Sequence, residues 1–368
     1  MTGHPADTPE QLRYLAFYLP QFHPIPENDA WWGSGFTEWT NVRRGTPLFA
    51  GHHQPHLPDP SLGFYDLRDP LTREAQADLA LRYGIDGFVY YHYWFGGRRL
   101  LERPFDEVLS SGQPAFPFCL CWANENWTRA WDGGAGTTLV AQRYADEDDR
   151  AHIRWLSEAF ADPRYVRVNG KPLLLIYRSS DLPDVRRTTA IWREEAARLG
   201  VGGLYLCRVE AFDGDRGDPT SLGFDAGVEF QPDWSRTGRR LKPGTDDATE
   251  PGMQPADDLD CVTLFSYPIA AELAVTHPPV PYKRYRCVMP GWDNTARRGG
   301  SGTVFVGSSP ERYRRWLASV ASSFRPFSPD ENLIFINAWN EWGEGAHLEP
   351  DTRWGRGYLE GHLLGTGR

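Results

Sequence analysis

A chain of 368 residues with 40% hydrophobic side chains can bury one large core, and its net charge of −10 argues against nucleic acid or anionic lipid as a general partner. It has no apolar run of about 18 residues, so we expect no membrane span, and residues 1–11 lack the apolar stretch of a signal peptide, which predicts a cytoplasmic protein. Tryptophan and tyrosine are abundant, and their flat apolar faces with polar edges suit sugar rings.

Eight short runs rich in aromatic and β-branched residues recur along the chain. Several are almost continuously apolar, which is typical of strands covered on both faces. The runs are Tyr14–Leu19, Gly87–Tyr93, Phe116–Trp122, Pro172–Tyr177, Leu204–Val209, Ala226–Phe230, Arg286–Met289 and Leu333–Ala338. The five cysteines are an odd number and four lie in strand-like runs, so we expect buried free thiols at positions 119, 121, 207, 261 and 287.

Segments with helical spacing separate the predicted strands. The apolar residues that repeat at three or four positions are Leu71, Ala75 and Leu79; Ile153, Leu156 and Phe160; and Tyr313, Trp316, Leu317 and Val320. A further helix is expected over Ile191–Leu199, closed by Gly200. Repeated strand–helix alternation predicts an α/β fold, a single (β/α)8 TIM barrel. The alternative is an open doubly wound sheet, but the first strand leads into Leu19-Pro20-Gln21-Phe22-His23-Pro24 and not into a glycine-rich phosphate turn.

The predicted domain organisation is a disordered tail over residues 1–12 and one barrel over residues 13–365. Two long connections follow strands 1 and 6, at residues 20–69 and 231–259. Loops of this length in a compact domain are usually functional or disordered. We expect the aromatic first loop to form an ordered wall of the active site and the more polar second loop to be mobile at its tip.

Polar and aromatic residues gather where the predicted strands end, which is the active-site face of such a barrel. Burying these groups without partners costs several kcal/mol each by order of magnitude, so a purely structural protein has no reason to collect them there. The candidate substrate-binding residues at strand ends are Tyr18, His92, Trp94, Trp122, Asn124, Glu125, Asn126, Tyr177, Glu229, Trp292, Asp293, Trp339 and Asn340. Gln21, His23, Tyr93, Glu210, Gln231 and Asn294 lie at the same ends.

The segment after the eighth strand offers a pair of carboxyl groups, Glu341 and Glu344, with Trp342 between them. Glycosyl transfer needs two carboxyl groups in different protonation states. At a strand end that turns into a loop, this spacing can bring both side chains to one face, where each perturbs the titration of the other. We therefore predict that both are catalytic. The structural alternative is that one of them caps the turn or pairs with an arginine.

Glu125 offers a competing arrangement. Retaining barrel glycosidases set an acid/base glutamate that follows an asparagine against a nucleophilic glutamate across the barrel mouth, and Asn124-Glu125 and Asn340-Glu341 fit that pattern. Their predicted strands are five steps apart in one direction and three in the other. We favour Glu125 as a substrate-positioning residue.

Four ordered motifs carry a family resemblance. They are Phe17-Tyr18-Leu19-Pro20-Gln21-Phe22-His23, Gly35-Phe36-Thr37-Glu38-Trp39-Thr40-Asn41-Val42, Cys121-Trp122-Ala123-Asn124-Glu125-Asn126-Trp127 and Asn337-Ala338-Trp339-Asn340-Glu341-Trp342-Gly343-Glu344-Gly345. With them the chain resembles the WbsX-type proteins, which are related to the family 99 glycoside hydrolases (endo-mannosidase-like) and are often met in O-antigen and other polysaccharide gene clusters. The resemblance runs from about Tyr14 to about Glu360.

The resemblance implies a (β/α)8 barrel and a retaining mechanism without a covalent sugar ester. Carried over, Glu341 assists the sugar 2-hydroxyl in attacking the anomeric carbon to give a 1,2-anhydro sugar, and Glu344 is the general acid and then the general base. Glu38 and Trp39 of the second motif become candidate substrate contacts. Gly343 departs from the family 99 pattern, which has histidine there, so the substrate contacts of that position do not transfer.

Other motifs have more ordinary interpretations. His52, His53 and His56 fit no standard zinc spacing, so we expect hydrogen bonding within the loop and no metal or cofactor. The run Arg297-Arg298-Gly299-Gly300-Ser301-Gly302 is expected to be a flexible, solvated loop, with a cradle for a phosphate or uronate as the alternative. Trp31 and Trp32 either stack on sugar or pack the long loop, and His92 either grips a sugar hydroxyl or packs in the core.

Three classes of function remain open at this point. The first is a glycoside hydrolase acting on α-linked glycans of bacterial polysaccharide. The second is a glycosyltransferase of polysaccharide biosynthesis, although a double Rossmann architecture or a metal-holding Asp-x-Asp after a strand is not evident. The third is a non-catalytic carbohydrate-binding barrel, which the presence of both Glu341 and Glu344 argues against. The expected partner is an oligosaccharide or polysaccharide, and the oligomeric state is open.

Overall fold

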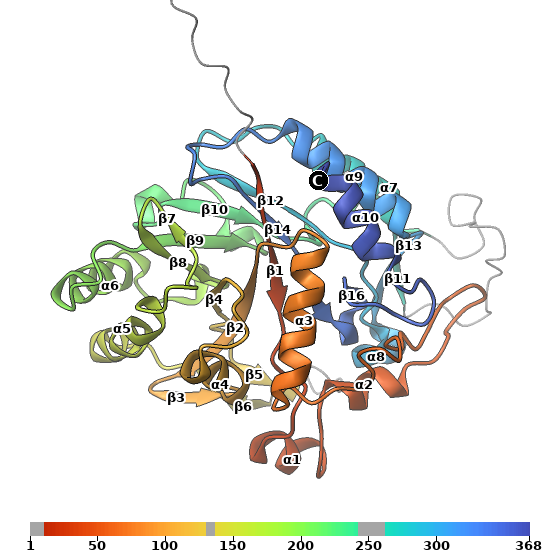
Figure 1. Cartoon of the computed structure of the whole chain (residues 1–368), viewed down its shortest axis with the longest axis horizontal. Helices are drawn as coiled ribbons and strands as arrows, with labels where there is room; N and C mark the ends of the chain where they lie inside the picture. Colours follow the sequence, from red (N-terminus) through yellow and green to blue (C-terminus); the bar gives the residue numbers. More distant parts are fainter. Residues whose placement is uncertain (1–10, 130–136, 242–261) are drawn as a thin grey trace, which may run out of the picture.

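The computed structural model describes residues 11–129, 137–241 and 262–368, and a closed parallel barrel forms its centre (Figure 1). Strand β14 pairs with β1, and β1 pairs with β2, which closes the ring. In ring order the strands are β1 (Arg13–Tyr18), β2 (Gly87–Phe95), β4 (Phe118–Trp122), β8 (Lys171–Ile176), β9 (Tyr205–Glu210), β10 (Ala226–Glu229), β12 (Arg284–Val288) and β14 (Leu333–Ile336). The ends of each predicted run lie within two residues of these strands, so the (β/α)8 prediction is confirmed.

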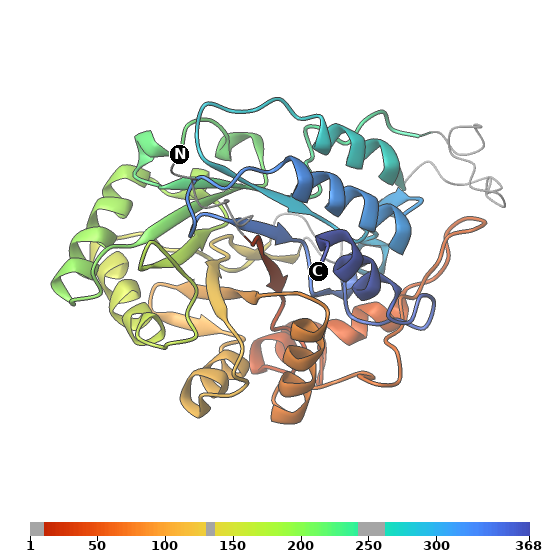
Figure 2. The same ribbon diagram turned by 45° about the horizontal axis from the view of Figure 1, so that its top comes forward.

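Helices cover the outside of the barrel, as Figures 1 and 2 show from two directions. The helices that follow barrel strands are α3 (Pro70–Arg82), α4 (Arg103–Ser111), α5 (Asp146–Phe160), α6 (Val185–Arg198), α7 (Tyr267–Val275), α9 (Pro310–Ser323) and α10 (Gly357–Thr366). Between β9 and β10, where every residue is described, the connection contains the 3-10 turns η3 (Asp213–Asp215) and η4 (Thr220–Leu222) in place of an α-helix.

Short elements decorate the barrel and its loops. They are α1 (Pro26–Trp32), α2 (Glu38–Arg44), β3 (Arg98–Leu100), β5 (Trp127–Thr128), β6 (Thr138–Val140), β7 (Arg167–Val168), η2 (Ser179–Asp181), β11 (Thr263–Ser266), α8 (Thr295–Arg298), η6 (Gly299–Ser301), β13 (Thr303–Val306), β15 (Asn340–Glu341), η7 (Trp342–Glu344) and β16 (Ala346–His347). Helices α1 and α2 lie in the long loop after β1, which is ordered as predicted.

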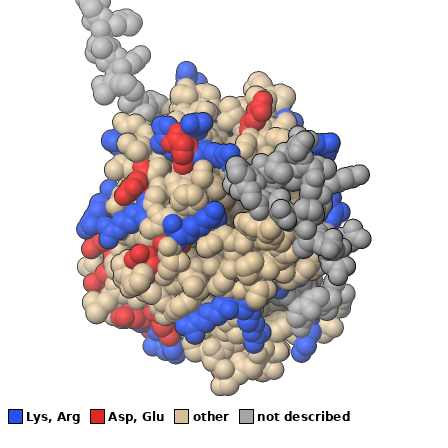
Figure 3. All heavy atoms as spheres, turned by 90° about the vertical axis from the view of Figure 1, so that its right-hand side faces the viewer, with Lys and Arg blue, Asp and Glu red and all other residues tan. Residues whose placement is uncertain are grey.

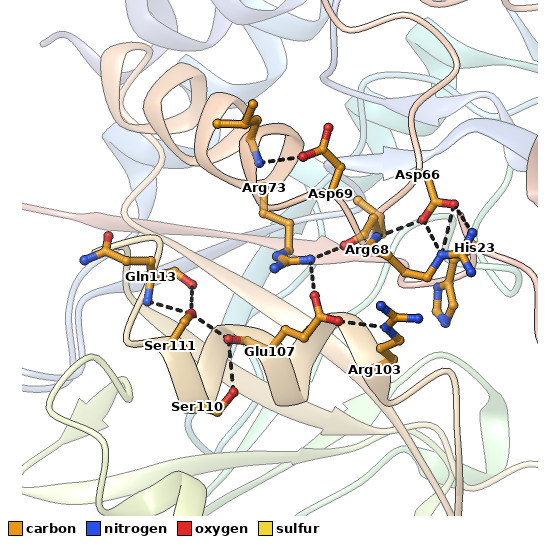
Figure 4. A network of polar contacts seen from close by, with 12 residues as sticks. His23, Asp66, Arg68, Asp69, Arg73, Arg103, Glu107, Ser110, Ser111 and Gln113 are labelled. Carbon is orange, nitrogen blue, oxygen red and sulfur yellow. Dashed lines mark hydrogen bonds and ion pairs between the residues drawn. The ribbon is translucent and has the colours of Figure 1, made fainter.

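The residues whose spacing marked α5 and α9 are buried, whereas those that marked α3 are buried only in part. Leu79 is buried, but Leu71 is 69% exposed and Ala75 is exposed as well, and the buried face also carries Arg73 and Gln76. Arg73 Nη1 lies 2.9 Å from Glu107 Oε2 of α4 and donates to the carbonyl of Leu67 (Figure 4). Apolar spacing therefore located this helix, while polar partners contribute to its buried face.

Several predictions concern residues that the structure describes only in part. Cys119, Cys121, Cys207 and Cys287 are buried free thiols as expected, while Cys261 lies outside the described residues. The predicted mobile tip of the loop after β10 falls mostly on residues 242–261, which are not described. The predicted tail is described only at positions 11 and 12, where Asn332 Nδ2 donates to the carbonyl of Gln11. The domain limits therefore stay predictions.

The surface carries charges of both signs. On the face drawn in Figure 3, basic and acidic side chains are interspersed among uncharged ones. Among the described residues, the helices are all too short or too polar to cross a membrane.

Candidate active site

A tight hairpin after β14 positions the two predicted catalytic carboxyl groups. Strands β15 and β16 pair antiparallel, and the 3-10 turn η7 connects them. A 3-10 helix has about three residues per turn, so side chains three apart lie above one another. Glu341 and Glu344 therefore leave the turn on one side. Gly345 ends the turn with a φ of 60°, and a Cβ there would lie 3.0 Å from Asp293 Cβ, so both conformation and space favour glycine.

Buried hydrogen bonds hold this hairpin against the barrel. The side-chain amide of Asn340 accepts from the Leu19 N–H at 2.7 Å and donates to the Leu19 carbonyl at 3.0 Å, which joins the hairpin to the end of β1. Within the turn, Trp342 Nε1 donates to Glu349 Oε2 at 2.6 Å. Tyr65 and Gln76 also donate to the Glu349 carboxyl group. Asn340 and Trp342 thus fix the first half of the hairpin to the barrel and its neighbouring loops.

One arginine holds both carboxyl groups together with a third. Arg297 Nη2 lies 2.8 Å from Glu341 Oε2, and its Nη1 lies 2.6 Å from Glu344 Oε1. Its Nε donates to Glu38 Oε1 at 2.7 Å. The side chains of Arg297 and Glu341 are 8% and 7% exposed, and that of Glu38 is fully buried. The pairing with an arginine that we weighed as the structural alternative is therefore present, and it involves both carboxyl groups.

This ion-pair cluster leaves excess negative charge in a buried place. Burial raises the pKa of Glu341, Arg297 opposes this, and the carboxylates of Glu344 and Glu38 add to it, with the result that the pKa is about 8. Burial also raises the pKa of Glu344 against the opposing effect of Arg297. Because these two groups titrate together, the proton belongs to the pair. A pair of carboxyl groups whose titrations are coupled in this way is suited to supply one acid and one base.

The pair forms part of the wall of a cavity of about 680 Å³ at the carboxyl ends of the strands. Aromatic side chains make up much of the lining: Trp31, Trp32, Tyr91, Tyr93, Trp127, Tyr177, Phe212, Phe230, Trp234 and Trp292. Polar lining residues include Gln21, Asn28, Glu125, Asn126, Asn294, Arg297, Arg298, Glu341 and Glu344. Carboxyl groups beside flat apolar rings are the surroundings expected for sugar chemistry.

Comparisons with known proteins agree with this architecture. The family described as "Glycosyltransferase WbsX" matches residues 14–361. The chain belongs to the WbsX family. Two proteins named "Uncharacterized protein WxcX", from Xanthomonas campestris pv. campestris strains B100 and ATCC 33913, are each 45% identical to it, over 98% and 94% of this chain but only 50% and 48% of their own lengths. The chain thus spans about half the length of these relatives.

Solved structures share the fold at low identity. A family 99 endo-α-mannosidase from Bacteroides thetaiotaomicron, in complex with BIS-TRIS-propane, superposes with a TM-score of 0.58 and 14% identity, covering 96% of each chain. A structure named "Glycoside hydrolase-like protein" gives a TM-score of 0.60 and 13% identity, covering 99% of this chain and 97% of its own. The WbsX chain therefore has the barrel fold of these proteins.

Some of the predicted site residues line the cavity. Besides Glu341 and Glu344, they are Glu125, Asn126, Tyr177 and Trp292. The ring order places β4 three steps from β14 through β2 and β1, so Glu125 and the carboxyl pair share one cavity. Glu125 Oε1 lies 2.8 Å from Arg178 Nη1. Its role as a substrate-positioning residue stays a prediction.

Five predicted contacts point away from the cavity, because alternate strand residues face opposite sides of a barrel wall. Tyr18 donates to Gln76 of α3, His92 contacts His152 of α5 and stacks on Trp155, and Trp94 donates to Asp148. Trp122 donates to the Trp94 carbonyl, and Glu229 pairs with Arg286. These five side chains pack between barrel and helices and are not among the residues that line this cavity, so their substrate contacts stay predictions; His92 packs in the core, as the alternative for it has it.

Other predicted contacts support the loops instead of lining the cavity. Asn124 exchanges hydrogen bonds with the Arg178 backbone, and Trp39 donates to the Tyr65 carbonyl. Trp339 is fully buried against Phe88, and Asn340 is bound to Leu19. Asp293 accepts from Thr295 and contacts His52 Nε2 at 2.7 Å. The hydrogen bonds or packing of each lie within the protein, whereas Glu38 reaches the site through Arg297, and their substrate contacts stay predictions.

Sequence reasoning missed several cavity residues. Leu19, Tyr91 and Phe230 line the cavity one residue away from Tyr18, His92 and Glu229. Period-two alternation along the first strand places Leu19 on the same side as Phe17. The ring of Phe17 contacts Tyr91 and Phe230, so these residues share that side, but only the tertiary structure shows it. Phe212 and Trp234 come from loops, where the sequence has no comparable period.

The predicted flexible, solvated character of the arginine run is wrong for Arg297. This residue ends up buried in α8 among three carboxylates, whereas Arg298 is exposed and lines the cavity. No local pattern marks the difference, because the carboxylates lie far away in the sequence.

The histidine-rich loop forms hydrogen bonds, as predicted. His52 Nδ1 accepts from the Leu48 N–H at 3.0 Å, and the rings of His56 and His347 approach to 3.1 Å between nitrogens. Across the described ranges, side chains of histidine, cysteine, aspartate and glutamate nowhere gather in a group that could hold a metal ion.

Proposed function

We propose that this WbsX-family chain is a glycoside hydrolase that cleaves α-linked glycans of bacterial polysaccharide with retention of configuration. The observation that carries the proposal is the pair Glu341 and Glu344, which leaves one turn on one side and lines an aromatic cavity, where burial raises the pKa of both groups. Glycosidic cleavage requires one carboxyl group that donates a proton and one that acts as base or nucleophile, and this pair can supply both.

The shared ion pair with Arg297 is compatible with this chemistry. One guanidinium carries a single positive charge and faces three carboxylates, so it orients Glu341 and Glu344 without neutralising them both. Glu344 also keeps 22% of its side chain exposed, on the cavity side. A carboxyl group that is held but not neutralised can still exchange a proton with a bound sugar.

In the first proposed step, the Glu341 carboxylate removes the proton of the sugar 2-hydroxyl. The 2-oxygen then forms a bond to the anomeric carbon while the bond to the leaving oxygen breaks. Glu344 donates its proton to that leaving oxygen, so the products are a 1,2-anhydro sugar and a free alcohol. In the second step Glu344 removes a proton from water, which attacks the anomeric carbon while the bond from that carbon to the 2-oxygen breaks, and Glu341 returns the proton to the 2-oxygen. Two inversions give net retention.

The roles of the two carboxyl groups rest on the family resemblance. The pKa of Glu341 is raised to about 8 by burial, which favours a proton on the proposed base. Because the proton belongs to the pair, a substrate that places its 2-hydroxyl beside Glu341 and its leaving oxygen beside Glu344 would move it. The two possible assignments of acid and base can be distinguished by comparing a substrate whose leaving group needs protonation with one whose leaving group does not.

Variants test the proposal directly. We expect Glu341→Gln and Glu344→Gln each to lower kcat by about two orders of magnitude or more while leaving the fold intact. An aryl leaving group that departs without protonation should restore much of the first-step rate in Glu344→Gln and little in Glu341→Gln. The reverse pattern exchanges the two roles, and wild-type-like activity in either variant contradicts the proposal. Glu229→Gln, which removes a buried carboxylate outside the cavity, is the matched control.

The family name supports glycosyltransfer as the second candidate function. Incubation with a panel of α-linked glycans, with and without nucleotide sugars, distinguishes the two. Release of reducing sugar without a nucleotide supports hydrolysis, whereas a product that appears only with a donor supports transfer. A substrate in which hydrogen replaces the 2-hydroxyl lacks the internal nucleophile. Its rate of cleavage should therefore be lower by at least about a hundredfold.

A further inference from the structure

Position 343 has unusually little space for a side chain. A Cβ at Gly343 would lie 1.8 Å from Glu38 Oε1 and 2.8 Å from Arg297 Nε. Gly343 is absent from the residues with positive φ, so its backbone is open to other residues and space alone selects glycine. The contact between Glu38 and Arg297 therefore occupies the volume that a side chain in the catalytic turn would fill.

Glu38 reaches this place from a different part of the chain. It is the first residue of α2, in the loop after β1, and its side chain is fully buried. Its Oε2 lies 3.5 Å from Gln21 Nε2, so Arg297 is its closest polar contact. Burying a carboxylate this completely is costly unless a charged partner compensates for the lost water. Arg297 supplies that compensation through its Nε.

The division of the guanidinium among three partners has an electrostatic consequence. Its Nε faces Glu38, and its two terminal nitrogens face Glu344 and Glu341. The buried pair with Glu38 already balances the one positive charge of Arg297. Two further carboxylates then gain hydrogen bonds but little net neutralisation.

We propose that Glu38 is a positioning residue that keeps Arg297 electrically balanced, so that Arg297 orients Glu341 and Glu344 without neutralising them both, and that Gly343 provides the space for this contact. This inference rests on the proposed function for its catalytic meaning. Its electrostatic part holds whether or not a glycan is cleaved.

Other charged and titratable groups face the same cluster and stay constant in the variants below. Tyr91 and Tyr93 of β2, and Tyr177 after β8, interact electrostatically with the pair. Arg298 of α8 and Glu125 after β4 act on Glu344. Since Arg298 is exposed to solvent and Arg297 is buried, the charge of Arg297 has the larger influence on the pair.

Glu38→Gln tests the electrostatic part, because glutamine keeps the volume and an oxygen that accepts from Arg297 Nε. With its charge no longer balanced, Arg297 stabilises the ionised pair. We expect the alkaline limb of the kcat/KM profile to move to lower pH by about one unit or more, since an opposite charge within a few ångströms lowers a carboxyl pKa by about 1–3 units. A purely structural Glu38 would change activity equally at all pH values. Glu229→Gln, which removes the carboxylate paired with Arg286 Nε, should leave the limb unmoved.

Gly343→Ala tests the spatial part. We expect it to lower kcat/KM at least about tenfold in the wild-type background, because the new methyl group displaces the Glu38 carboxylate. In a Glu38→Ala background the 1.8 Å contact is gone and only Arg297 Nε, 2.8 Å from the new methyl group, has to shift, so the additional effect should be below about threefold. Equal effects in the two backgrounds would overturn the spatial part, and thermal unfolding of all four proteins confirms that they fold.

A direct titration separates this inference from the proposed function. Difference infrared spectroscopy follows the protonated carboxyl band of the pair in the full chain, with Glu341→Gln identifying the signal. We expect the band to disappear at lower pH in Glu38→Gln than in the wild type, by about one unit or more. A shifted band in a protein that cleaves no glycan supports the inference and contradicts the hydrolase proposal. An unshifted band in an active hydrolase overturns the inference alone.

Discussion

The shared proton predicts that replacing Glu341 changes how stability depends on pH. In the native state burial raises the pKa of Glu341 to about 8, whereas the ordinary value in an unfolded chain is 4.5. Between these values the native state binds the proton and the unfolded chain does not. The stabilisation is therefore fully present below pH 4.5 and is lost as the pH rises through 8.

The size of this effect follows from the linkage relation. One proton bound only by the native state lowers the free energy of unfolding by about 1.4 kcal/mol for each pH unit of increase. From about pH 5.5 to about pH 7.5, both inside the interval, the loss amounts to at most about 3 kcal/mol. Glu341→Gln removes this titration and leaves Glu344 next to Arg297 without a charged neighbour in the turn. The variant should therefore lose activity while becoming less sensitive to alkaline pH.

Urea unfolding of the wild type, Glu341→Gln and Glu229→Gln at the two pH values measures the effect. We expect the wild type to lose roughly 1–3 kcal/mol more than Glu341→Gln between them. Glu229→Gln controls for the removal of a buried, ion-paired carboxylate elsewhere and should follow the wild type. If Glu341→Gln and the wild type lose stability in parallel, the pair does not hold a proton near neutral pH, and the acid–base argument fails with it.

Three further outcomes are expected. Trp234→Ala should raise KM about two- to tenfold with a smaller effect on kcat, because this ring lines the cavity and is 37% exposed. Initial-rate measurements test this, and an unchanged KM would exclude stacking of the sugar on Trp234. Gly223→Ala should lower the free energy of unfolding, measured with urea, by about 2 kcal/mol without changing activity. The reason is that the φ of Gly223 is 88° and a Cβ there would lie 2.3 Å from Thr189 Oγ1. A free energy of unfolding equal to that of the wild type would refute this. Activity should survive dialysis against a chelator, and its loss with recovery on metal addition would contradict the carboxyl-pair mechanism.

Much of the barrel was predictable because local pattern and long-range structure agree. Strands covered on both faces need apolar side chains at nearly every position, and that need is visible in the sequence without knowledge of their neighbours. That Glu341 and Glu344 lie on one side of a turn could also be predicted from their three-residue spacing, since a short turn is a local structure. The orientation of single side chains could not. Tyr18, His92 and Glu229 were selected for their chemistry, while their neighbours line the cavity.

The sequence by itself determined the eight strands, the order of the elements and the carboxyl pair in one turn. Only the tertiary structure decided that Arg297 binds that pair and that Glu38 binds Arg297 through the space left at Gly343. Glu38 and Arg297 are 259 positions apart, and closure of the barrel brings their loops together. The physical reason is that strand formation depends on neighbours along the chain, whereas the partner of a buried charge depends on which loops meet in space.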